Sequence, residues 1–199
     1  MYLETSLALL HGDLDRAAKL ADELGEALWR VRRFAAPSTR AALLAMIDAE
    51  HGAVDDALAH VTVIESTRYG DSVCWLKAWI LADAGRKADA AAALASFDGP
   101  LADDWYRTPL TAAGEMAAAL LGDREFLGRH LEELLPLVDQ FASAGNGGFI
   151  SSPVAYAAEL ELGDADAAQA HATQTLAMSE RMGVVRWTAR IRALSARPG

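Results

Sequence analysis

The chain has 199 residues, of which 52% are hydrophobic, and its formal net charge is −10. This length suits a single domain, and we expect residues 1–199 to form one. The negative charge argues against direct binding of nucleic acid or of an anionic membrane, because surfaces that bind phosphate accumulate lysine and arginine. The single cysteine, Cys74, excludes an internal disulfide and a cysteine-rich zinc site.

The N-terminal segment does not resemble a signal peptide. Residues 1–5 contain no basic stretch, and the apolar stretch near the N-terminus stops at Leu10. No other stretch approaches the length of apolar sequence that crosses a bilayer. We therefore expect a cytoplasmic protein.

The sequence predicts an all-α fold. It is rich in alanine, contains only 6 prolines and nowhere shows the alternating pattern of a half-buried strand. Apolar periodicity and turn residues predict five helix pairs, over residues 2–10 and 13–33, 38–51 and 53–67, 73–84 and 87–97, 108–121 and 123–142, and 150–162 and 164–182. We expect Pro136 to kink or end its helix. Residues 98–107 and 143–148 are predicted connections, and a last helix over 184–196 is expected to cover the open end of the stack.

A glycine marks the turn inside each predicted pair. These glycines recur at intervals of 33 to 41 residues, at Gly12, Gly52, Gly85, Gly122 and Gly163. Glycine adopts the left-handed backbone conformation that ends a helix, and the carboxylates that follow most of these glycines suit the first turn of the next helix. Five residues after the glycine stands an alanine in four pairs and Leu127 in the other, which predicts that this hairpin is more splayed or shifted in register. A repeat of this length is typical of helix-turn-helix solenoids.

The spacing from the glycine to the alanine resembles that of tetratricopeptide repeats, in which it joins the turn to the second helix. The chain departs from that family at Ala41, Cys74 and Ser152, where a large aromatic residue is usual. The resemblance implies a right-handed α-solenoid of about five hairpins with a C-terminal capping helix. The first helix of each pair is then expected to line an inner groove.

Residues 162–168, 175–183 and 186–190 carry a second resemblance. They are similar to the helical arrays of large bacterial signalling ATPases, including LuxR-type and AfsR-type transcriptional regulators and some adenylate cyclases. The resemblance implies that the chain is part of, or related to, a bacterial signalling regulator. The nucleotide-binding module of those proteins is not expected here, since the chain has no G-x-x-x-x-G-K-[ST] motif and no Gly-Lys pair.

No residue pattern indicates catalysis or metal binding. The five histidines lack the spacing of metal ligands, and adjacent acid pairs such as Asp55 and Asp56 diverge around a helix. No serine or cysteine has the context of a nucleophile. We predict a protein that is not an enzyme and has no cofactor or metal. The basic residues near Trp29 and Trp187 are interpreted as favourable charges at helix ends and as stems that cover apolar surface.

The tetratricopeptide resemblance places Trp75 and Trp79 on the inner groove, with Met46, Met116 and Ile150 at equivalent positions. Aromatic and methionine side chains form adaptable binding walls, so these five are the candidate binding residues. The alternative, that both tryptophans merely pack between hairpins, is equally compatible with the sequence.

Two functions follow from these patterns. The first is a noncatalytic protein-interaction or ligand-sensing domain that holds a peptide, a partner protein or a small ligand. The second is a structural spacer that transmits a conformational change to an ATPase or DNA-binding domain on a longer chain. A binder is expected to have an open apolar cleft, whereas a spacer is expected to fill its groove with its own side chains.

Overall fold

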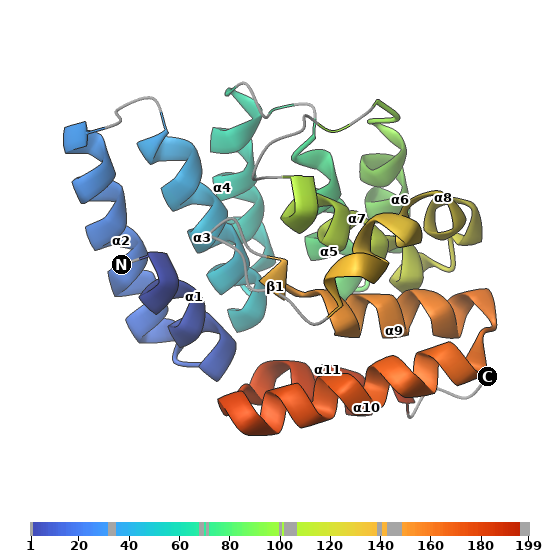
Figure 1. Ribbon diagram of the computed structural model, residues 1–199. Helices are drawn as coiled ribbons and strands as arrows, with labels where there is room; N and C mark the ends of the chain where they lie inside the picture. Colours follow the sequence, from blue (N-terminus) through green and yellow to red (C-terminus); the bar gives the residue numbers. More distant parts are fainter. Residues whose placement is uncertain are drawn as a thin grey trace.

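The computed structural model describes residues 2–31, 35–67, 70, 72–99, 101, 107–138, 141–142 and 149–195. This part of the chain is helical, which confirms the all-α prediction (Figure 1). The helices are α1 (Tyr2–His11), α2 (Leu14–Val31), α3 (Ala36–His51), α4 (Val54–Glu65), α5 (Cys74–Asp83), α6 (Lys87–Ala95), α7 (Arg107–Leu121), α8 (Arg124–Leu134), α9 (Ser151–Leu162), α10 (Ala165–Met182) and α11 (Val185–Ser195). The only strands among the described residues, β1 (Phe141–Ala142) and β2 (Phe149–Ile150), pair antiparallel over two residues each.

The predicted turn glycines lie between helices in the left-handed conformation. Their φ angles run from 75° at Gly85 to 90° at Gly163, and Gly183, between α10 and α11, has a φ of 66°. At the end of α3 the amides of Gly52 and Ala53 donate to Ala49 O and Asp48 O, which satisfies two carbonyls that the helix leaves open. Glycine is needed at this position because a side chain is strained at such a φ.

Carboxylates cap the next helices, as the sequence predicted at several turns. Asp123 Oδ1 accepts a hydrogen bond from the Phe126 amide at 3.0 Å, and Asp164 Oδ1 accepts one from the Ala167 amide at 3.0 Å. Each bond satisfies an amide that has no partner within its own helix. The turns are therefore defined by local chemistry on both sides of the glycine.

One predicted helix is shorter than expected. The helix predicted over 123–142 ends at Leu134 and passes into a 3-10 turn, Leu135–Leu137, that contains Pro136. Proline lacks an amide hydrogen, and its ring clashes with the carbonyl four residues earlier, so an α-helix rarely continues through it. The predicted link 143–148 lies outside the described residues.

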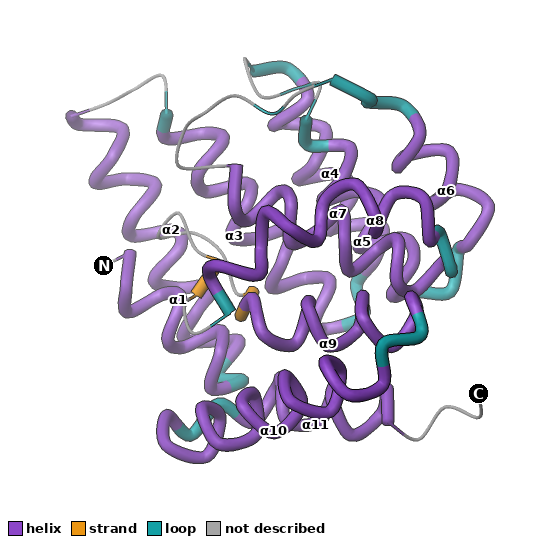
Figure 2. Tube along the Cα trace, turned by 45° about the vertical axis from the view of Figure 1, so that its right-hand side comes forward, coloured by secondary structure: helices purple, strands orange, loops and turns teal. Residues whose placement is uncertain are grey.

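Each helix packs against the one that follows it, and α7 also packs against α5 and α9. In Figure 1 the blue and teal helices α2–α4 stand upright, while α9 and α10 cross the lower part of the molecule. Figure 2 shows α10 and α11 side by side below α9. The last helix, α11, also contacts α1, so the two ends of the helical chain meet.

The alanines that stand five residues after the turn glycines are buried in the core. Ala17, Ala57 and Ala90 have no exposed surface and Ala168 is 2% exposed, as expected where two helices cross closely. Leu127, in the fourth pair, is also fully buried. No helix in the described ranges is both long and apolar enough to cross a membrane.

Candidate functional site

The predicted groove residues lie in the core. Met46, Trp75, Trp79 and Met116 are between 0% and 3% exposed. Ile150 lies in β2, and its side chain is outside the described residues. An exposed apolar wall is therefore absent at the four residues whose side chains the structure describes.

Trp75 and Trp79 are one turn apart on α5, but they contact different parts of the molecule. The Trp79 ring centroid lies 5.6 Å from the guanidinium carbon of Arg190, on α11. Trp75 instead faces Phe97, Phe126 and His130 on the side of α6 and α8. The two indoles therefore point toward different neighbours, Trp79 toward α11 and Trp75 toward α6 and α8.

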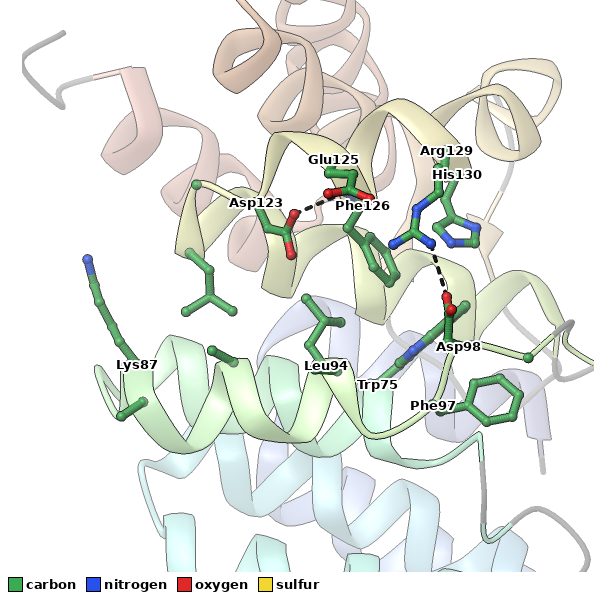
Figure 3. A pocket seen from close by; sticks show the side chains of 16 residues that line it. Trp75, Lys87, Leu94, Phe97, Asp98, Asp123, Glu125, Phe126, Arg129 and His130 are labelled. Carbon is green, nitrogen blue, oxygen red and sulfur yellow. Dashed lines mark hydrogen bonds and ion pairs between the residues drawn. The ribbon is translucent and has the colours of Figure 1, made fainter.

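The surface near Trp75 is a cleft of about 840 Å³ between α6 and α8 (Figure 3). One wall is α6, which contributes Ala88, Ala91 and Ala95. These residues, three and four positions apart, share one face of the helix. Because alanine side chains are so short, they leave the space open that longer side chains would fill. The opposite wall is α8, which contributes larger side chains.

An aromatic cluster forms the floor of the cleft. The Trp75 ring lies edge-on to Phe126, with centroids 5.1 Å apart, and to His130, with centroids 5.2 Å apart. Phe97 completes the cluster at 5.8 Å from Trp75. These spacings are those of favourable edge-to-face aromatic pairs. The floor of the cleft is therefore built on tightly packed rings that hold one another in place.

A glycine in α7 permits this close packing. A Cβ on Gly114 would lie 2.9 Å from Phe126 Cζ and 3.0 Å from Trp75 Cδ2, closer than carbon atoms pack. Both aromatic side chains are buried, at 4% and 2% exposure, so neither can move aside easily. Gly114 thus positions the aromatic floor against α7.

Charged side chains line the rim. Arg129 Nη1 donates to Asp98 Oδ1 at 3.0 Å, and its guanidinium carbon lies 6.0 Å from the Phe126 ring centroid. Lys87 and Glu125 stand at the mouth and, in the described part of the chain, form no ion pair (Figure 3). They are therefore available to a ligand that carries charge at its ends.

His130 adds a neutral polar edge to the floor. Burial lowers the pKa of His130, and the charge of Glu133 opposes that effect only in part. The ring is therefore uncharged at neutral pH. Its Nδ1 lies 3.9 Å from Glu133 Oε1, beyond hydrogen-bond distance.

Sequence reasoning selected Trp75 but missed Phe126, Arg129 and His130. The available signal was the Phe126-x-x-Arg129-His130 spacing, which places the three side chains on one helix face, and the alanine face of α6. Within the described residues, no three His, Cys, Asp or Glu side chains come together as a metal site.

Comparisons of the chain with protein-family models, with curated proteins and with solved structures find no match. The function is accordingly inferred from the chain's own residues and their geometry.

Proposed function

We propose that the chain is a noncatalytic interaction domain built as a tetratricopeptide-like solenoid of five hairpins, and that it holds a peptide segment of a partner protein in the cleft between α6 and α8. The repeated left-handed glycines and the packing of each helix on the next support the solenoid. The resemblance of the last third to signalling arrays supports a setting in a cytoplasmic bacterial regulator.

The cleft is the observation that carries this proposal. Its volume of about 840 Å³ falls in the range of binding pockets, which are typically about 300–1,000 Å³ and combine an apolar lining with a few polar groups. Phe97 is partly exposed in the cleft, and the buried rings of Trp75 and Phe126 hold the floor rigid beneath it. The short side chains of α6 let another backbone approach closely.

A peptide with an apolar side chain between charged neighbours matches this lining. The apolar side chain lies in the cleft against the partly exposed ring of Phe97, where its burial supplies most of the affinity. The neighbouring charges pair with Lys87 and Glu125 at the mouth, where exposed ion pairs add specificity more than affinity.

The spacer function remains the alternative, and the position of α11 favours it. Trp79 is fully buried and lies against Arg190 of the chain's own last helix. A self-filled groove of this kind suits a rigid element that transmits movement between its two ends.

The two functions are separated by blocking the cleft. Ala91 and Ala92 are both exposed on α6, but only Ala91 lines the cleft. We expect Ala91→Trp to fill the cleft and to abolish capture of a partner from an extract of the source organism, as measured by affinity purification and mass spectrometry. Ala92→Trp is the matched control and is expected to retain the partner. Equal capture by the wild-type chain and both variants would refute binding in this cleft.

A further inference from the structure

Arg190 of α11 occupies a charged site formed by the ends of two other helices. Its Nη1 and Nη2 donate to the two carboxylate oxygens of Asp83, at 2.6 and 3.0 Å, and Nη2 also donates to Glu50 Oε1 at 2.6 Å. The paired contact with Asp83 matches the planar fork of a guanidinium, which an ammonium group cannot reproduce.

The same guanidinium lies against two indole rings. Its central carbon is 5.6 Å from the Trp79 ring centroid and 5.7 Å from that of Trp187. Both tryptophans are fully buried, and the Arg190 side chain is 20% exposed. Cation–π attraction strengthens where water is excluded, so the rings add to the selectivity for a cation.

The positions of the two carboxylates make a cation necessary. Asp83 is the last residue of α5, and Glu50 is the penultimate residue of α3. The C-terminal end of a helix carries a partial negative charge, so a carboxylate there is unfavourable unless a cation neutralises it. Two such ends converge on one point, and Arg190 supplies the positive charge.

The helix that carries Arg190 is anchored on a single face. Trp187, Arg190 and Ile191 are three and four positions apart, and Trp187 and Ile191 are 0% and 1% exposed. Gly183 and Val184 alone connect α11 to α10. The helix also packs against α1, α9 and α10, so it is a short amphipathic helix whose apolar face is held by other helices of the same chain.

We propose that Glu50, Asp83 and Trp79 form a guanidinium-recognition site that α11 occupies, and that a partner helix with an arginine three residues after an aromatic anchor binds the same site when α11 leaves it. None of these residues lines the cleft between α6 and α8, so the site is a second interaction surface. Binding there exchanges one arginine for another and releases α11.

The test uses the full chain and a labelled synthetic peptide of residues 183–197. In the wild-type chain the resident helix competes at an effective concentration on the order of 1 mM, so we expect it to exclude the peptide. Arg190→Ala removes the resident guanidinium, and this variant is expected to bind the peptide. The same peptide with alanine in place of Arg190 is expected to bind at least about tenfold more weakly, because it lacks the charge-assisted hydrogen bonds.

Arg192→Ala is the matched control, because Arg192 is an exposed arginine on the same helix. This variant is expected to exclude the peptide as the wild-type chain does. Circular dichroism first establishes that each variant is folded. If Arg190→Ala does not fold, Arg190→Lys takes its place, since lysine keeps the charge but loses the fork.

A folded Arg190 variant that binds both peptides equally, or binds neither at about 1 mM, would overturn the proposal. Peptide binding by the Arg192→Ala chain that equals binding by the Arg190 variant would also overturn it. Either result would mean that the contacts of Arg190 stabilise the fold but do not mark a binding site for a partner.

Discussion

Glu115 is a carboxyl group placed where its charge is unfavourable. It lies in α7 with no exposed surface, and among the residues that the structure describes neither carboxylate oxygen has a hydrogen-bond partner. Burial, together with the smaller effect of the nearby Glu133 charge, raises the pKa of Glu115 from 4.5 to about 8. At neutral pH the native chain therefore holds a proton that the unfolded chain releases.

This difference makes the free energy of unfolding depend on pH. Below pH 4.5 both states hold the proton, and the contribution to stability is fully present. Between pH 4.5 and about 8 only the native state holds it, so stability falls by about 1.4 kcal/mol for each pH unit. From pH 6 to 8 the expected loss is about 2–3 kcal/mol, and above the folded pKa the loss is complete.

Glu115→Gln removes the titration while keeping the shape of the side chain. We expect the variant to lack this pH-dependent loss, so its stability relative to the wild-type chain rises by about 2–3 kcal/mol from pH 6 to 8. Urea unfolding at pH 6, 7 and 8 measures the difference. Glu125→Gln is the control, because it makes the same chemical change at an exposed position on α8 and is expected to follow the wild-type chain. A constant difference between Glu115→Gln and the wild-type chain across this range would refute the reasoning.

Three further substitutions test the packing by urea unfolding. Gly114→Ala is expected to destabilise by about 1–3 kcal/mol, because its Cβ meets Phe126 and Trp75. Gly128→Ala, in open space on α8, is the control and is expected to stabilise by about 0.5–1 kcal/mol. Equal effects of the two substitutions would contradict the close approach of α7 to the two aromatic rings. Ala57→Leu is expected to destabilise by about 1–3 kcal/mol through overpacking. Ala59→Leu, at an exposed position, is the control and is expected to change stability by less than about 0.5 kcal/mol. Unchanged urea midpoints in both variants would show that the two helices do not cross at Ala57. Asp123→Ala removes the cap of the Phe126 amide and is expected to cost about 1 kcal/mol, and no change would mean that water replaces the cap fully.

The helices and the turns between them were predictable because their signals are local. At the end of α3 the amides of Gly52 and Ala53 donate to carbonyls three and five residues earlier, and Asp123 caps the amide three residues ahead of it. Short-range chemistry of this kind is present in any stretch of sequence that contains the turn. The predicted end of α8, residue 142, lies several residues beyond its observed end at Leu134, although Pro136 was expected to kink or end this helix.

The position of α11 was not predictable by the same reasoning. Arg190 contacts residues 107 and 140 positions earlier in the chain, Asp83 and Glu50. No local pattern reports which helix ends converge in space. Among the basic residues near Trp187, Arg190 does lie at helix ends, but these ends belong to α3 and α5.

The inner-groove assignment of Trp75 and Trp79 fails to give exposed residues for a physical reason visible in α5 itself. From Cys74 to Ala82 every residue except Lys77 is apolar, and all of these apolar residues are buried. A helix that is apolar on all sides is surrounded by protein, so its periodicity cannot tell which face meets a ligand. The neighbouring α6 is the informative element, because its exposed alanines Ala88 and Ala91 have short side chains and line the cleft, whereas Trp75 is only 2% exposed. In a helical array of this kind, an open cleft is therefore better sought beside the helix with the shortest side chains than along the helix with the largest ones.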